Sequence, residues 1–319
     1  VSADNKAFAV TLVLSGGCLA AFAGPEIAQA AKGAFGDENR TYLGAFLAVA
    51  AFNILNALFV GAVHFPEASA PPKPSPGEQE SEEQQEVGKH HNQDGTTILG
   101  LLTRRQFWVP AMIAMFSWAI MVMPMSIVRI AMQQLGYSSR ESLLTVELHS
   151  LGMFCPGFVT ANLINNLGAL RVSGLAVVMF VLATTVSMLS TESTSVATWM
   201  FALVALGIGW NFGFSSATVL LTHAYACAPS FKPKVQAAND FVMFLLAGSF
   251  IFSTGYIYEA GGSSLAGWRT VNTVVFGMIG IMALIVLGEM VLQQRERSER
   301  SDKSTDQTYA SGGIDDEQV

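Results

Sequence analysis

Charged side chains are scarce in this sequence of 319 residues. Only 13% of the residues are charged and 51% are hydrophobic, whereas an average soluble domain is about 25% charged. This composition excludes a single soluble core as the fold. Basic residues are the scarcer kind, with 17 Lys and Arg against 24 Asp and Glu. Without a basic face we expect no nucleic-acid partner, and we expect a lipid bilayer to surround most of the chain.

Patterns typical of catalysis, metal binding and cofactor binding are also missing from the sequence. The three cysteines lie in or beside apolar runs and have neither metal-ligand spacing nor a disulfide framework. The sequence has no nucleophile–base arrangement, phosphate-binding loop or dinucleotide fingerprint. We therefore expect no enzyme, no metal and no cofactor, and any transport would have to be driven by a gradient.

Long apolar runs fill most of the chain. About 20 such residues cross a bilayer, and only helices and closed barrels satisfy their backbone hydrogen bonds in lipid. The runs are too long for barrel strands and do not alternate. We therefore predict an all-α polytopic membrane protein with about eight transmembrane helices, near Phe8–Ala31, Tyr42–Val63, Phe107–Met132, Ser142–Leu163, Val172–Ser190, Thr198–Leu221, Ala237–Tyr258 and Trp268–Leu292.

Two hydrophilic stretches divide the chain into four parts. Residues 1–64 hold two spans and residues 106–293 hold six. Between them, residues 65–105 are acidic and rich in Pro, Glu and Gln, a composition that favours a disordered linker; we expect the same of the tail at 294–319. Lys and Arg are more than twice as frequent in the connections on one side, which places both termini in the cytosol. We expect the plasma membrane rather than an organelle.

The first apolar run contains residues that interrupt or narrow a membrane helix. Pro25 removes a backbone donor and kinks a helix, which lipid tolerates only where neighbours or a cavity satisfy the exposed carbonyl. Gly16, Gly17, Ala20 and Gly24 form a strip of small residues suited to close helix packing. We therefore regard Gly24 and Pro25 as candidates for a kink or gate.

The Gly24-Pro25 stretch resembles the Gly-Pro motif in the fifth helix of the major facilitator superfamily, which is associated with antiporters. The linker lies where that superfamily joins its two six-helix halves. The segment ANLINNLGALRVSG resembles the second, degenerate copy of its loop motif, with Gly168 and Arg171 matching and the acidic position replaced. These two residues are further gating candidates.

The resemblance implies the C-terminal six-helix bundle plus the last two helices of the N-terminal bundle, in an N-terminally truncated chain. We expect such a chain not to transport a solute by itself. The function implied is secondary active transport of a small solute by alternating access, as proton-coupled antiport or efflux. The alternative is a non-transporting eight-span scaffold or receptor-like protein, in which the mid-membrane asparagines could be replaced by Leu without loss.

Polar residues inside the apolar runs are candidates for the solute pathway, because polar groups are costly in a membrane. Two such residues share a face of the second run, and a polar stripe follows helical spacing in the sixth, where an adjacent tryptophan could stack on a solute. The alternative interpretation for both runs is hydrogen bonding between helices. The candidates are Asn53, Asn56, Trp210, Asn211, Ser215 and Thr218.

Three ionisable residues lie toward the outer ends of the third and fourth runs. Arg129, Glu147 and His149 could form a cluster that binds protons, since histidine titrates near physiological pH. Alternatively, Arg129 and Glu147 reach the membrane surface and His149 binds a backbone carbonyl. Asn239 and Asp240 open the predicted seventh run, where they could form an inner gate or cap the start of the helix.

Overall fold

The computed structural model describes residues 3–31, 43–62, 97–262 and 264–312. Every regular element within these ranges is helical, and seven of the helices are long and apolar enough to span a membrane. The chain divides into two units, residues 1–101 and 102–319, and each is described by itself. Most of the predicted linker, residues 65–96, lies outside the described ranges.

The first unit contains the first two predicted spans. Helix α1 (Ala3–Ala31) continues through Pro25, and α2 (Leu43–Ala62) packs against it. Pro25 has no N–H group to donate to the carbonyl of Ala21, so it weakens α1 at this point without ending it. A short helix, α4 (Ile98–Leu102), follows.

The second unit contains the six remaining spans. Short 3₁₀ turns at Thr222–Tyr225 and Pro229–Phe231 connect its fourth and fifth spans. The long helices are α5 (Arg105–Gln134), α6 (Ser139–Phe154), α7 (Gly157–Leu167), α8 (Ala169–Met188), α9 (Val196–Leu221), α10 (Lys232–Ala260) and α11 (Ser264–Gly312).

Helix α9 lies at the centre of this bundle and contacts α5, α6 and α8. Three glycines make the close contacts possible. A Cβ at Gly207 would lie 2.5 Å from a backbone oxygen of α6, and one at Gly209 would lie 2.8 Å from the Phe180 ring of α8. Gly213 similarly leaves room for Ser117 of α5. Close van der Waals packing of this kind drives association where lipid removes the hydrophobic driving force.

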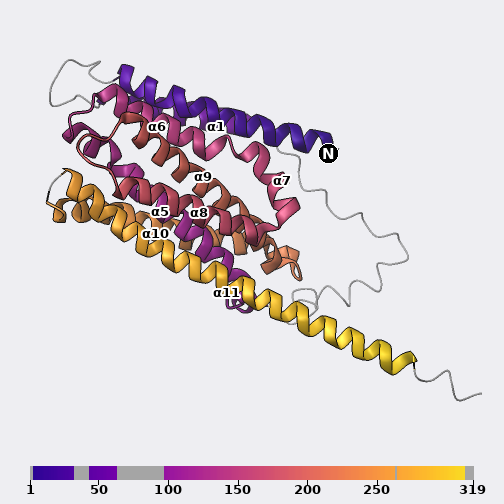
Figure 1. Ribbon diagram of the computed structural model, residues 1–319. Helices are drawn as coiled ribbons and strands as arrows, with labels where there is room; N and C mark the ends of the chain where they lie inside the picture. Colours follow the sequence, from indigo (N-terminus) through magenta and orange to yellow (C-terminus); the bar gives the residue numbers. More distant parts are fainter. Residues whose placement is uncertain (1–2, 32–42, 63–96, 263, 313–319) are drawn as a thin grey trace, which may run out of the picture. The chain divides into compact units, whose positions relative to one another are not determined.

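The fourth predicted span is two helices instead of one. Helix α6 ends at Phe154, α7 begins at Gly157, and the chain changes direction between them (Figure 1). Pro156 lies at the break, immediately before α7, where its ring crowds the preceding turn and it supplies no backbone donor. The break leaves the last carbonyl groups of α6 without helical partners.

Two helices extend beyond their predicted ends. Helix α10 begins at Lys232 with Pro233 in its first turn, so Asn239 and Asp240 lie two turns inside the helix and do not cap its start. Helix α11 continues to Gly312, past the other helices of the bundle (Figure 1), where we expected disorder from residue 294. The Glu, Gln, Arg and Lys residues after the apolar run have high helix propensity, which the prediction neglected.

Candidate functional site

His149 is enclosed between α6 and α9. Its side chain has no exposed area, and Nδ1 lies 2.7 Å from the carbonyl oxygen of Leu203. Because a carbonyl only accepts, Nδ1 carries the proton and Nε2 is the unprotonated nitrogen of the neutral ring. Nε2 is buried and has no hydrogen-bond partner among the described residues. The ring therefore makes the backbone contact of the alternative interpretation and keeps one nitrogen available to bind a proton.

The other two members of the predicted proton cluster lie on α5 and α6, and no hydrogen bond to His149 is seen for either among the described residues. Glu147 is 1% exposed on α6, two residues from His149, so the two side chains leave the helix in different directions. Arg129 is half-buried on α5, which packs against α6. Its Nε atom is buried without a hydrogen-bond partner in the described part of the chain. Glu147 is thus far more deeply buried than a residue at the membrane surface would be.

Asn211, near the middle of α9, bonds to the break between α6 and α7. Its Nδ2 donates to the carbonyl oxygen of Met153 at 2.7 Å, an oxygen that an unbroken helix would pair with the N–H of Gly157. Thr160 Oγ1 on α7 lies 2.6 Å from Asn211 Oδ1 and 2.7 Å from Pro156 O, so its one proton has two acceptors. This is the interhelix bonding that the alternative interpretation describes, and a solute contact for Asn211 stays a prediction.

The other candidates on α9 differ in exposure. Trp210 is 7% exposed and stacks on Phe214, with ring centroids 5.3 Å apart and 8° between the planes. Ser215 is half-buried and Thr218 is exposed, and the Thr218 hydroxyl donates to the carbonyl of Phe214 in its own helix. The predicted polar stripe therefore turns from the bundle interior toward its surface along α9.

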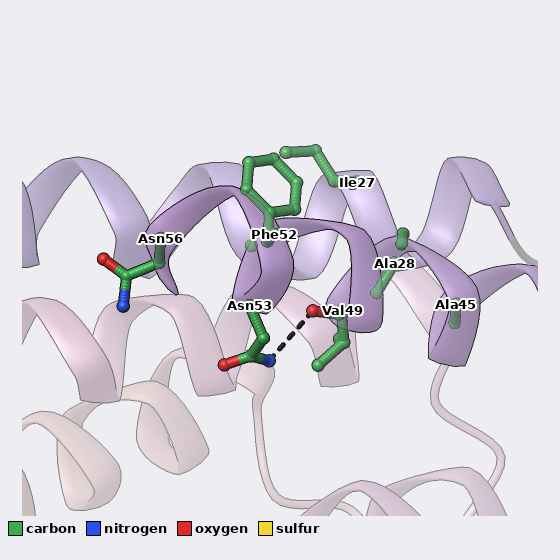
Figure 2. Close-up of a pocket in the computed structure, with 9 residues that line it drawn as sticks. Ile27, Ala28, Ala45, Val49, Phe52, Asn53 and Asn56 are labelled. Carbon is green, nitrogen blue, oxygen red and sulfur yellow. Dashed lines mark hydrogen bonds between the residues drawn. The ribbon is translucent and has the colours of Figure 1, made fainter. Parts of the chain in front are cut away.

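Helices α1 and α2 line an open hollow of about 370 Å³ (Figure 2). Gly24 and Ala28 supply small residues from α1, and Asn53 and Asn56 lie on one side of α2 (Figure 2). Asn53 Nδ2 donates to the carbonyl of Val49 at 2.9 Å within its own helix. The structure thus brings together two groups of residues that the sequence singled out separately, the Gly-Pro stretch and the asparagine pair.

The remaining gating candidates lie at helix ends or inside α10. Gly168 joins α7 to α8 with φ at 88° and ψ at 145°, a conformation that glycine adopts far more readily than other residues. Arg171 is exposed, and its Nη1 donates to the carbonyl of Leu167 at 3.3 Å, at the end of α7. Asn239 Nδ2 donates to Asp240 Oδ1 at 3.1 Å. Their roles in gating stay predictions.

The sequence analysis missed a charged cluster at the start of α5. Arg105 Nη2 lies 2.7 Å from Glu296 Oε1, and Arg105 Nε lies 3.5 Å from Glu289 Oε2, both on α11. Glu289 is 8% exposed and accepts a hydrogen bond from Gln293. An acid inside the last apolar run was the available signal. No group of three or more metal-ligating His, Cys, Asp or Glu side chains occurs among the described residues.

A family model of the Major Facilitator Superfamily matches residues 1–251. The chain belongs to the major facilitator superfamily. This confirms the resemblance seen in the sequence and the prediction of an all-α, multi-pass integral membrane protein. That the six spans of the second unit form the C-terminal bundle, as the resemblance implies, stays a prediction.

Three curated relatives are similar to this superfamily member. The riboflavin transporter RfnT of Brucella anthropi is 27% identical over 279 residues, which cover 88% of this chain and 63% of the relative. The uncharacterized MFS-type transporters YddS and YdeG of Bacillus subtilis are 28% and 27% identical over 46% and 50% of this chain, and 33% and 36% of their own lengths. The chain thus spans less than two thirds of each relative. No solved structure matches it significantly.

Proposed function

We propose that this protein is a secondary active transporter of a small solute that works by alternating access between the two sides of the membrane. Membership of the major facilitator superfamily is the observation that carries this proposal. The transporter names of the relatives also favour a transporter over an enzyme. Both termini are cytosolic and the membrane is the plasma membrane, as the distribution of Lys and Arg favours for orientation.

Solute movement is coupled to protons through Arg129, Glu147 and His149. Buried ionisable groups in a membrane mark ion pathways by default, since their burial is costly. His149 supports this role because Nε2 is the unprotonated ring nitrogen and has no hydrogen-bond partner in the described part of the chain. The Gly-Pro stretch of α1 favours antiport or efflux over uptake.

The solute pathway includes the hollow lined by Gly24, Asn53 and Asn56. Asn56 and the Oδ1 atom of Asn53 offer uncharged polar groups at this surface, which suits a neutral polar solute. Because RfnT is named a riboflavin transporter, riboflavin is the first solute to test. A solute contact at Asn211 requires the α6–α7 break to move, since both amide atoms of Asn211 are engaged there.

The test compares cells that carry the native gene with cells from which it is deleted. Accumulation and efflux of labelled riboflavin and of a panel of small solutes are followed across an imposed pH gradient. Gene-dependent, saturable transport of any one solute supports the proposal. Equal fluxes in both cell lines for the whole panel would favour the non-transporting scaffold. Transport by a His149→Ala variant with unchanged pH dependence would remove His149 from the coupling scheme.

A further inference from the structure

Five aromatic side chains meet near the middle of the second unit. They come from four helices: Trp118 from α5, Phe154 from α6, Trp210 and Phe214 from α9, and Phe244 from α10. Trp118 lies edge-to-face with its neighbours, its ring centroid 5.2 Å from that of Trp210 and 5.3 Å from that of Phe244. We call these five residues the aromatic cluster. Trp118, Trp210 and Phe244 lie near the middle of their helices, whereas Phe154 is the last residue of α6 and lies at the α6–α7 break.

Each of the two tryptophans of the aromatic cluster has a buried indole N–H group that is unpaired as far as the structure is described. Trp118 Nε1 and Trp210 Nε1 have no hydrogen-bond acceptor among the described residues. Two other tryptophans in the same unit are bonded, since Trp199 Nε1 donates to Tyr137 and Trp268 Nε1 donates to the carbonyl of Ser187. A buried indole N–H normally finds a partner, so these two groups lack a bond that an acceptor from outside the chain could supply.

The cluster also offers ring surface that other side chains leave open. Phe244 is 53% exposed, and Trp118 and Phe214 are only half-buried. Planar rings stack on such faces at a favourable energy whatever their substituents. A cation could also bind aromatic faces, but it offers no lone pair to an indole N–H. Two N–H donors beside open ring faces instead select a planar heterocycle with carbonyl or ring-nitrogen acceptors.

We infer that the aromatic cluster is the solute-recognition site of the second unit and that it binds a planar heteroaromatic solute. This inference rests on the proposed function. The ring of the solute stacks on the cluster, and acceptor atoms at its edge receive the N–H groups of Trp118 and Trp210. Trp210 thereby has the stacking role that the sequence indicated, and Trp118 is a further specificity-determining residue.

Binding to the purified 319-residue chain in detergent tests this inference. The probe is lumichrome, a planar tricyclic heterocycle with ring carbonyls, and its fluorescence falls when it stacks on tryptophan. Trp118→Phe and Trp210→Phe keep the ring face and remove the N–H, so each should weaken binding about 2- to 10-fold. Trp210→Ala removes both and should weaken it at least about tenfold. Trp108→Phe, at a tryptophan 44% exposed near the start of α5, is the control and should bind like the parent chain.

Several outcomes overturn the inference. The first is that the parent chain shows no saturable lumichrome binding. The second is that both Trp→Phe variants bind lumichrome as tightly as the parent chain while their melting temperatures match the parent. The proposed function is judged separately, by transport in cells. Transport of a solute without an aromatic ring, together with no lumichrome binding, overturns this inference alone. Specific lumichrome binding without any transport overturns the proposed function and keeps the site.

Discussion

Replacing Asn211 by Leu tests whether this residue holds the α6–α7 break in place. Leu has the branching and the number of heavy atoms of Asn but is larger, so the change removes the two hydrogen-bonding atoms and leaves no cavity. Asn211 Nδ2 then no longer donates to the carbonyl of Met153, which lost its helical partner at the break. The Thr160 hydroxyl keeps the carbonyl of Pro156 as its acceptor. The main loss is therefore the single bond to Met153.

The expected cost follows from that bond. A buried acceptor left unsatisfied costs about 1–3 kcal/mol, while interhelix hydrogen bonds in membranes average about 0.6 kcal/mol and reach about 1.7 kcal/mol. Because the break at Pro156 supplies no backbone donor for Met153, we expect a value near the top of the membrane range, about 1–2 kcal/mol. For a unit of this size, that lowers the melting temperature by roughly 2–8 °C.

Thermal unfolding of the purified chain in detergent, followed by circular dichroism, measures the effect. Thr218→Val is the matched control, because Thr218 is exposed on the same helix and its hydroxyl bonds only within that helix. Equal melting temperatures for Asn211→Leu and Thr218→Val would refute the idea that Asn211 holds the α6–α7 break in place. A stable Asn211→Leu protein that loses transport would instead make Asn211 a solute contact, and one that keeps full function would favour the scaffold.

Three further predictions use the same unfolding assay. Gly207→Ala should destabilise the bundle by about 1–3 kcal/mol, because its Cβ would lie 2.5 Å from a backbone oxygen of α6, whereas Gly280→Ala, with open space at its Cβ, should not. Arg105→Gln should lower the free energy of unfolding by more than the roughly 0–1 kcal/mol typical of surface ion pairs. The reason is that it removes the cation beside the buried carboxylate of Glu289. An unchanged melting temperature would contradict this. Asn53→Leu should change stability by less than about 0.5 kcal/mol, since Asn53 is exposed, yet lower transport in cells; full transport would remove Asn53 from the pathway.

The sequence predicted which residues lie inside apolar runs, but it did not predict which side chains they contact. His149 was correctly placed inside an apolar run, but its backbone partner, Leu203, lies on a helix that the run itself does not specify. The sequence singled out Trp210 for stacking on a solute, which stays a prediction, whereas Trp118 passed unnoticed within a methionine-rich run. Neither contact could be predicted, for the same reason. The side chains that meet depend on how one helix is rotated against another, and that rotation depends on small residues such as Gly207 on the neighbouring helix.

The sequence by itself determined the all-helical fold, the positions of the spans and the family. Apolar length is a local property, and a bilayer converts it directly into a transmembrane helix. Only the tertiary structure decided which polar groups meet. Arg105 and Glu296 are 191 residues apart and bond at 2.7 Å, and Asn211 bonds to the helix break at Pro156. Such contacts depend on packing several helices at once, so no single stretch of the chain contains the information.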